Sequence, residues 1–287
     1  YDKPVGLGSD APPDAEDVAQ ERGLYDGAIA GIDDAVDVLL KGLDDRGLTQ
    51  STIIVITADH GESLDEPGRG SGHGDHLFGD EGTHVPFVVI DPRKAPQKRV
   101  QSIVRDVDLA PTLYELTGVA GPGDLDGQSL VPALGGAPLR EAFAYAETGL
   151  WFTQEIKGVP ERLRIPYPTL EGITELDPVH GDEIVITEEM KNLTLVAKHR
   201  MVRDERWKLV YAPTRAGAQY LLFDTQNDPR EQNDLAAAQP AEVARLKGAL
   251  WQWMLEDRAM TERNGWLVPR TEDRRTDAEG VRVEAAK

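Results

Sequence analysis

The apolar positions between about Asp14 and Arg46 recur every three or four residues, which is the period of an α-helix with one apolar face. Gly47 follows directly, and glycine often ends a helix there because it readily adopts a left-handed backbone conformation. The pattern therefore predicts a helix over residues 14–46. Its apolar stripe consists of Leu24, Ala28, Ile32, Val36, Leu39, Leu40 and Leu43.

Two short apolar runs, "STIIVITA" (51–58) and "VPFVVID" (85–91), predict strands. Both are apolar on both faces, which is typical of central strands in a parallel sheet that helices cover on each side. The stretch "DVDLAPTLYELTG" (106–118) then predicts a short helix that ends at Gly118. The order helix, strand, loop, strand, helix predicts an α/β domain over residues 1–137, with helices on both faces of its sheet.

Residues 138–287 predict a smaller domain of a different kind. The segments "EAFAYAET", "HRMVRDERWKLVYAP" and "AQYLLFDT" favour an antiparallel meander, and residues 240–255 favour an amphipathic helix. Residues 150–195 are rich in Pro, Glu and Gly, so we expect them to run over the surface as a long excursion. The charged tail from Thr271 is expected to be mobile.

Composition narrows the function classes. A formal charge of −20 argues against nucleic acid and disfavours anionic membrane surfaces as partners. The absence of cysteine excludes disulfides, thiolate zinc sites and a cysteine nucleophile in this chain. No apolar run approaches the ~18 residues that a transmembrane helix needs. Because the chain begins with Tyr1 rather than methionine, we expect a processed product or a fragment.

Candidate chemistry begins with Asp59 and His60, which directly follow the first predicted strand. In open α/β sheets, ligands bind outside the carboxyl ends of the strands. A carboxylate beside an imidazole suits zinc, manganese or iron, so the pair is a candidate metal site. The alternative is that Asp59 caps the following turn and His60 is a hydrogen-bonded loop residue.

Four of the six histidines lie between His60 and His84. His73 is surrounded by alternate glycines, which let the backbone approach a ligand closely. His73 and His76 are three residues apart, and His84 precedes the second predicted strand, so all three are candidates for the same site. A solvent-exposed polar loop explains the pattern equally well.

The order of these motifs resembles the sulfatase family of the alkaline phosphatase superfamily. The resemblance covers roughly residues 24–255 and implies an alkaline phosphatase-like α/β fold with a smaller antiparallel carboxy-terminal subdomain. It also implies a periplasmic or secreted location. The matching segments are "LYDGAIAGIDDAVDVLLKGLDDRGLTQSTIIVITADHGE", "GHGDHLFGDEGTHVPFVVIDP", "DVDLAPTLYELTGVAGPGDLDGQSLVPALGG", "RWKLVYAP" and "YLLFDTQNDPREQNDL".

The resemblance implies roles for the matching residues. Asp59 and His60 fall on one pair of metal ligands, for a single divalent ion that is calcium by family, with manganese or zinc as alternatives. His73 faces the leaving group or the ester oxygens, and His84 is a second catalytic or supporting residue. His76 is a candidate for substrate binding.

The basic stretch 198–215 adds two further candidates, because the family's carboxy-terminal sheet often leans over the active site. Lys198 and His199 are the residues that we expect to bind the anionic ester. The alternative is that this stretch is a solvated face of an antiparallel strand.

One departure from the family limits the inference. Its members carry a Cys or Ser before x-Pro-Ser-Arg, matured to formylglycine in sulfatases, and their first metal-binding aspartates lie near the amino terminus. Neither feature occurs in this chain. We therefore expect the chain to be a fragment whose missing amino-terminal half supplies the formylglycine.

The resulting function hypothesis is metal-dependent hydrolysis of a small-molecule or glycan sulfate ester, with an unknown oligomeric state and this chain inactive alone. The first alternative is phosphate or phosphonate ester hydrolysis, or phosphoglycerol transfer, on the same scaffold. The second is a non-catalytic binding module that kept the fold and lost the reaction.

Overall fold

The computed structural model describes residues 14–66, 69–74, 76–94, 99–149 and 157–270. The chain divides into two compact units, which are described separately here. The first comprises residues 1–65 and 85–140, and the second residues 66–84 and 141–287. The boundary that the sequence suggested between residues 137 and 138 stays a prediction. The tail from Thr271 lies outside the described residues.

The first unit opens with helix α1 (Ala15–Asp45), which confirms the predicted helix. Asp14 caps it by accepting hydrogen bonds from the N–H groups of Glu16 and Asp17, and the Asp17 carboxylate accepts the N–H of Asp14 in return. The helix stops just before Gly47, whose φ of 67° lies in the left-handed region, as predicted.

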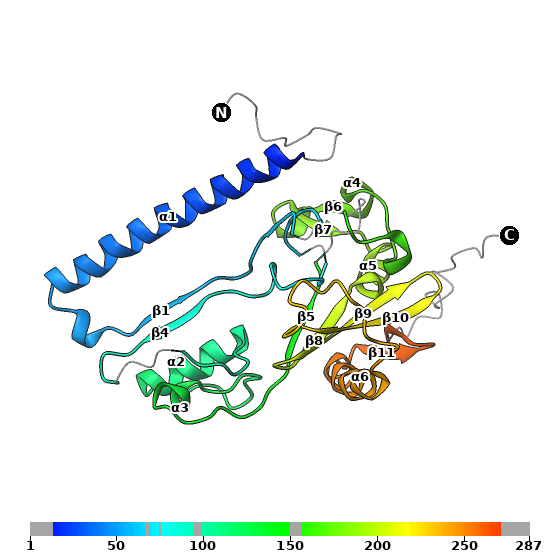
Figure 1. Ribbon diagram of the computed structural model, residues 1–287. Helices are drawn as coiled ribbons and strands as arrows, with labels where there is room; N and C mark the ends of the chain where they lie inside the picture. Colours follow the sequence, from blue (N-terminus) through cyan, green and yellow to red (C-terminus); the bar gives the residue numbers. More distant parts are fainter. Residues whose placement is uncertain (1–13, 67–68, 75, 95–98, 150–156, 271–287) are drawn as a thin grey trace. The chain divides into compact units, whose positions relative to one another are not determined.

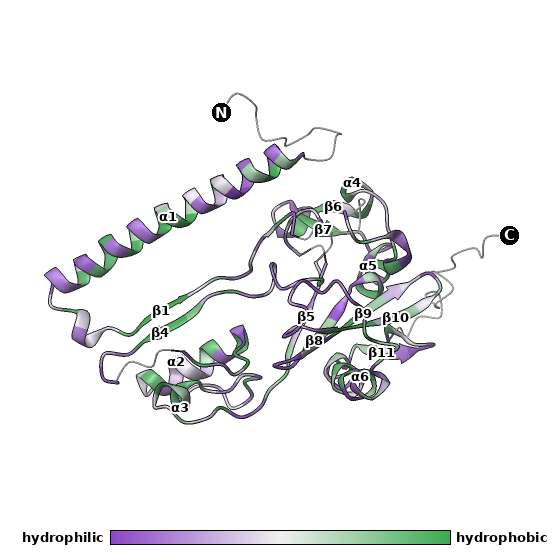
Figure 2. Ribbon diagram, in the orientation of Figure 1, coloured by the Kyte–Doolittle hydropathy of each residue, from purple (hydrophilic) through white to green (hydrophobic). Residues whose placement is uncertain are grey.

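Much of the apolar stripe of α1 lies on the surface. No residue of α1 is buried, and the exposed fractions of Leu24, Ile32 and Leu39 are 46%, 64% and 62%, while Val36, Leu40 and Leu43 are partly buried. Figure 2 shows the resulting alternation of hydrophobic and hydrophilic positions along the helix. The periodicity thus predicted the helix correctly without saying what covers its apolar face.

The two predicted strands form a pair, β1 (Ile54–Thr57) and β4 (Phe87–Ile90). They run antiparallel, with Ile54 opposite Ile90, so the expectation of parallel central strands is wrong for this pair. Apolar residues on both faces indicate burial, but they carry no information about strand direction. Among the described residues each strand has only the other as a ladder partner, and Val88 and Ile90 are both 44% exposed.

Helices lie on both sides of this strand pair in Figure 1, with α1 on one side and α2 and α3 on the other. Helix α2 ends at Gly118, which adopts a left-handed conformation with φ 70°, as predicted. The other elements of the unit are η1 (Thr49–Ser51), β2 (Ser63–Leu64), η2 (Asp106–Asp108), α2 (Leu109–Thr117) and α3 (Val131–Leu134).

The second unit is built on a four-stranded antiparallel sheet in the order β10-β9-β8-β5, which confirms the predicted meander. Every residue of β9 is buried, because the sheet is covered on both faces. Leu209 and Tyr211 face one core and Val210 the other, following the two-residue period of a strand. The strands are β5 (Ala144–Glu147), β8 (Arg200–Arg203), β9 (Trp207–Thr214) and β10 (Gly217–Asp224).

Helix α6 (Pro240–Met254) covers one face of this sheet through Leu246, Leu250 and Met254, which confirms the predicted carboxy-terminal helix. The hairpin of β11 (Met260–Arg263) and β12 (Trp266–Pro269) follows it. A short strand, β3 (Ser71–Gly72), also belongs to this unit.

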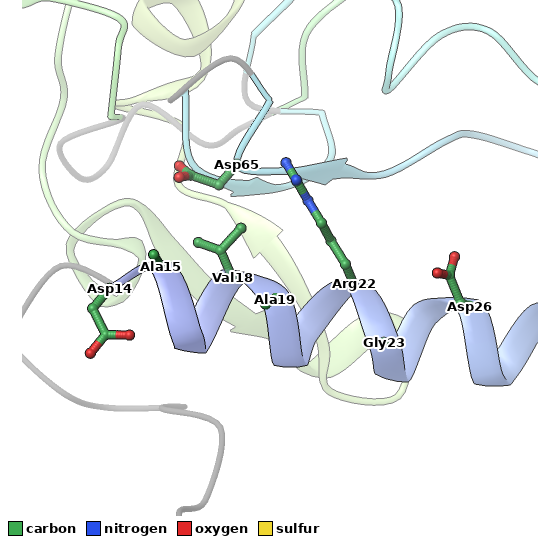
Figure 3. A pocket seen from close by; sticks show the side chains of 8 residues that line it. All are labelled: Asp14, Ala15, Val18, Ala19, Arg22, Gly23, Asp26 and Asp65. Carbon is green, nitrogen blue, oxygen red and sulfur yellow. The ribbon is translucent and has the colours of Figure 1, made fainter.

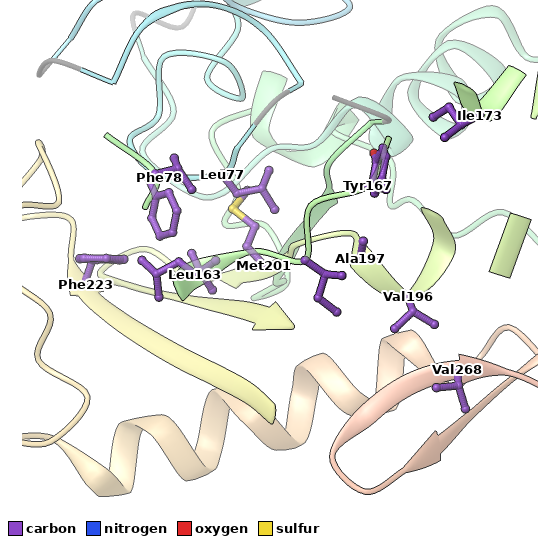
Figure 4. Close-up of a cluster of buried hydrophobic side chains, with 13 residues drawn as sticks. Leu77, Phe78, Leu163, Tyr167, Ile173, Val196, Ala197, Met201, Phe223 and Val268 are labelled. Atoms are coloured by element: carbon purple, nitrogen blue, oxygen red, sulfur yellow. The ribbon is translucent and has the colours of Figure 1, made fainter. Parts of the chain in front are cut away.

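Residues 157–197 contribute to the core on the other face of the sheet. Val159, Ile165 and Ile173 are at most 2% exposed and belong to the cluster drawn in Figure 4. The expected surface excursion is therefore wrong for residues 159–167 and Ile173, whereas residues 174–184 lie at the surface as expected, and residues 150–156 lie outside the described part. The elements are η3 (Glu161–Leu163), α4 (Leu170–Ile173), β6 (Thr174–Asp177), η4 (Pro178–His180), β7 (Glu183–Ile186) and α5 (Lys191–Ala197).

No helix among the described residues has both the length and the apolar character that crossing a membrane requires.

Candidate active site

Asp59 and His60 lie on the turn that follows β1, at its carboxyl end. The Asp59 carboxylate accepts the N–H of His60 at 3.0 Å, and its other oxygen lies 3.9 Å from Nε2 of His60. Nδ1 of His60 is 2.9 Å from the carbonyl of Gly61. When Nδ1–H donates to that carbonyl, Nε2 keeps the lone pair that a metal ion binds.

Glu62 adds a third candidate ligand that the sequence analysis did not select. One of its carboxylate oxygens lies within 4.8 Å of a ring nitrogen of His60. Asp59, His60 and Glu62 thus present two carboxylates and an imidazole from four consecutive residues. The signal was present in "ADHGE", where Glu62 stands two residues after His60.

Asp106 is electrostatically linked to this turn. Its partial burial, followed by the negative charge of Asp59, raises the pKa of the Asp106 carboxyl above its usual value. Two carboxylates that repel each other favour a nearby cation. Asp106 begins η2, and nothing in the sequence pattern connected it to Asp59.

The other predicted histidines belong to the second unit, in residues 69–84, which we call the histidine loop; Asp75 is outside its described part. His73 precedes Gly74, whose carbonyl accepts the N–H of Gly149 just after β5. His84 is exposed and ends a turn in which its N–H donates to the carbonyl of Asp80 at 2.7 Å.

His76 is neutral at physiological pH. Burial, together with the positive charges of Arg69 and Lys208, lowers the pKa of its imidazole to about 4. Its Nδ1 accepts the N–H of Phe78 at 3.3 Å, so the ring proton sits on Nε2. His76 is therefore suited to donating a neutral hydrogen bond rather than to transferring a proton near pH 7.

Lys198 and His199, both predicted to bind substrate, have protein partners in the second unit. Lys198 Nζ lies 2.5 Å from a carboxylate oxygen of Glu147. His199 is fully buried, its Nε2–H donates to the carbonyl of Leu163 at 2.7 Å, and its ring meets Phe78 edge-on at 5.8 Å. Burial lowers the pKa of His199 to about 4. This placement supports a structural role for His199 and does not support direct substrate contact.

The remaining basic residues of the 198–215 stretch also pair with carboxylates, so the stretch is not a solvated strand face. Much of it is buried in the sheet. The pairs are Arg200 with Glu147, Arg203 with Asp80, Arg206 with Asp224, Lys208 with Glu231 and Arg215 with Glu161.

A hollow beside the start of α1 is lined by three carboxylates and Arg22 (Figure 3). The Arg22 guanidinium donates to the carbonyl of Leu64 at 3.1 and 3.2 Å. Asp59 and His60 are not among the lining residues, so the hollow is separate from the candidate metal turn. It is lined by Asp14, Ala15, Val18, Ala19, Arg22, Gly23, Asp26 and Asp65.

Comparison with known proteins agrees with the fold and the motifs. The pattern of the Sulfatase family matches residues 5–119. The Delta 4,5-hexuronate-2-O-sulfatase of Bacteroides thetaiotaomicron is 30% identical over 210 residues, covering 69% of this chain and 42% of that protein. Arylsulfatase K of Xenopus laevis is 24% identical over 236 residues, covering 82% of this chain and 37% of that protein.

Among solved structures, the phosphonate monoester hydrolase of Agrobacterium radiobacter matches with a TM-score of 0.63 at 25% identity, covering 93% of this chain and 48% of that one. This likeness confirms the predicted α/β fold of the alkaline phosphatase type. The chain belongs to the sulfatase family of the alkaline phosphatase superfamily. It spans less than half the length of each of these three relatives.

Proposed function

We propose that the protein is a metal-dependent sulfatase-like hydrolase that cleaves a sulfate ester. The observation that carries the proposal is the turn after β1, where a carboxylate oxygen of Glu62 lies within 4.8 Å of a ring nitrogen of His60 and the Asp59 carboxylate lies 3.9 Å from Nε2 of the same ring. Membership of a hydrolase family supports the reaction class.

The donor set fits a divalent cation. Carboxylate oxygens suit calcium, while the imidazole of His60 favours manganese or zinc. Burial and the charge of Asp59 raise the pKa of the Asp106 carboxyl. A cation bound at this turn would reduce the repulsion between the two carboxylates. Bound there, the ion would neutralise the ester oxygens and polarise the bond that breaks.

This chain's histidines would serve the leaving group. His73 is proposed to donate a proton to the leaving oxygen as its bond to sulfur breaks, and His84 to support the same step. His76, which stays neutral near pH 7, is proposed to line the substrate site without changing its own charge. Lys198, which is 18% exposed, would add positive charge for an anionic substrate.

The nucleophile lies outside these 287 residues in this proposal. The chain contains no cysteine and no Ser before x-Pro-Ser-Arg, so the formylglycine would come from an amino-terminal half. Losing a catalytic nucleophile typically costs several orders of magnitude in rate. The chain alone should therefore be inactive.

A sulfated glycan is the substrate class that we favour, because a 30%-identical relative is named a hexuronate-2-O-sulfatase. Phosphate or phosphonate ester hydrolysis is the second candidate. The likeness to a phosphonate monoester hydrolase supports it, and so does the pairing of Asp59 with histidine.

The test is hydrolysis of nitrophenyl sulfate and bis-nitrophenyl phosphate, with calcium, manganese and zinc each supplied separately. We expect no turnover by residues 1–287, and turnover by a protein extended upstream that Asp59→Ala abolishes. Asp33→Asn, on the exposed surface of α1, is the matched control. Inactivity of both proteins would leave the non-catalytic binding module as the surviving hypothesis.

A further inference from the structure

Two oppositely charged side chains are buried together in the second unit. Lys208, in the middle of the sheet, and Glu231, after β10, both have fully buried side chains, and Lys208 Nζ lies 2.8 Å from Oε1 of Glu231. Burying two charges costs several kcal/mol per ion before their attraction is counted. Stability alone therefore does not explain why a charged pair occupies this buried position.

The pair holds one residue of the histidine loop from both sides. Lys208 Nζ donates to the carbonyl of Gly79 at 2.6 Å, and Oε2 of Glu231 accepts the N–H of Gly79 at 2.7 Å. Gly79 has a φ of 77°, and a Cβ there would lie 1.9 Å from Oε2 of Glu81. Both backbone polar groups of a buried glycine are thus satisfied by a single ion pair.

Neighbouring contacts hold further residues of the loop in place. Asp80 pairs with Arg203 and lies 3.6 Å from Lys208 Nζ, and its carbonyl accepts the N–H of His84. Upstream, Nη2 of Arg69 donates to the carbonyl of Glu231 at 2.9 Å. The loop is held at Arg69, Gly79 and Asp80, on both sides of His76 and immediately before the turn to His84.

The composition of the loop explains why it needs such anchors. Between residues 69 and 84 it contains five glycines, and it has little regular structure. Glycine-rich backbone loses more conformational entropy on ordering than any other, so the loop will not hold a fixed arrangement by itself.

We propose that Lys208 and Glu231 are positioning residues that fix the histidine loop by holding Gly79. The two residues come from the segments "RWKLVYAP" and "NDPREQNDL", so the pair gives both motifs a role in ordering the loop. The importance of the loop for catalysis rests on the proposed function, whereas its dependence on the pair does not.

The test is amide hydrogen exchange of residues 1–287, without substrate, in the double variant Lys208→Met/Glu231→Met. Removing both charges together leaves no uncompensated buried charge, so the thermal midpoint should fall less than in single Lys208→Met. Exchange in peptides from residues 76–84 should nevertheless rise about tenfold, because the polar groups of Gly79 lose their partners. Exchange in peptides from β9 and β10 should not change.

Leu222→Ala is the matched control, because it removes fully buried core volume in β10 without touching the loop. It should lower the thermal midpoint and raise exchange in the loop and the sheet together. Single Lys208→Met should release the loop and also destabilise the unit, because Glu231 keeps a buried charge without its lysine partner.

A second readout is the proton resonances of the His73 and His84 rings, assigned with His→Gln variants. They should move toward random-coil positions in the double variant and keep their positions in Leu222→Ala. Unchanged loop exchange and unchanged resonances in the double variant would overturn the proposal, even if the sulfatase assay succeeded. Faster amide exchange in the loop of the double variant would support the proposal. If the upstream-extended protein were inactive as well, that result would refute the proposed function alone.

Discussion

Asp106 is electrostatically coupled to Asp59: partial burial, and then the negative charge of the Asp59 carboxylate, raise the pKa of the Asp106 carboxyl above its usual value. The two residues stand 47 positions apart in the sequence, one after β1 and the other opening η2. A raised carboxyl pKa means that ionising Asp106 costs more in the folded state than in the unfolded state. The contribution to stability is therefore full at low pH and is lost as the pH rises through the folded pKa.

Asp59→Asn should consequently raise the stability of the chain at pH 7 and leave it unchanged well below pH 4. The gain should be less than about 1 kcal/mol, since both groups are largely exposed. Calorimetric thermal midpoints at pH 7 and pH 3 measure the difference. Asp33→Asn on α1 is the control, and an equal rise at both pH values would contradict the electrostatic explanation.

Divalent ions should bind the chain weakly through the turn after β1. Metal sites normally use at least three protein ligands, whereas on this turn only His60 and Glu62 are shown close enough to share an ion, with Asp59 beside His60. Millimolar manganese should raise the thermal midpoint slightly, and His60→Ala or Glu62→Gln should each abolish the rise. If His180→Gln, at an exposed histidine, abolished it equally, the assigned site would be wrong.

Acid should destabilise the second unit through its buried histidine. Burial lowers the pKa of His199 to about 4, so the folded state resists a proton that the unfolded chain accepts near pH 6.5. Its stabilising contribution is complete above pH 6.5 and declines as the pH falls toward 4, by up to about 3 kcal/mol.

His199→Gln should reduce this pH dependence and leave the share that comes from His76, because the Gln amide can donate to the carbonyl of Leu163 and carries no titrating proton. Urea unfolding at pH 7, 6, 5 and 4 gives the slope. The same slope in His199→Gln and the parent chain would refute the assignment, and His180→Gln serves as the exposed control.

Substitutions on the apolar stripe of α1 should be nearly neutral in the isolated chain. Ile32 and Leu39 are 64% and 62% exposed, so Ile32→Ser and Leu39→Ser should change the free energy of unfolding by no more than about 0.5 kcal/mol. Leu250→Ala, at a fully buried position, should cost about 2–5 kcal/mol. Chemical denaturation monitored by circular dichroism compares them.

The elements with strong periodicity were predictable from the sequence. The end of α1 followed from Gly47 and the end of α2 from Gly118, because helix capping is a local property, whereas the cap at Asp14 was not predicted. The meander and α6 were predictable because alternation and helical spacing are also local properties.

What the sequence left undetermined depends on contacts between distant residues. The direction of β4 relative to β1 is invisible in an apolar run, and Ile173 and Val159 gave no periodic signal of burial. The link between Asp59 and Asp106 and the burial of Lys208 appear only once separate segments are brought together. For the candidate site, local pattern gave Asp59 and His60 but not their electrostatic surroundings.

The anchoring of Gly79 has a consequence for the order of events during synthesis. The hydrogen bonds that hold it join residues 129 and 152 positions apart, so the ribosome completes the histidine loop long before it makes Lys208 or Glu231. Until that later stretch emerges and forms its sheet, the hydrogen bonds that hold Gly79 cannot form. In a nascent chain stalled after residue 200, the loop would lack its contacts with Lys208 and Glu231. Protease cleavage within residues 69–84 should therefore occur in chains stalled there and disappear in chains stalled later, after the sheet and Glu231 have formed.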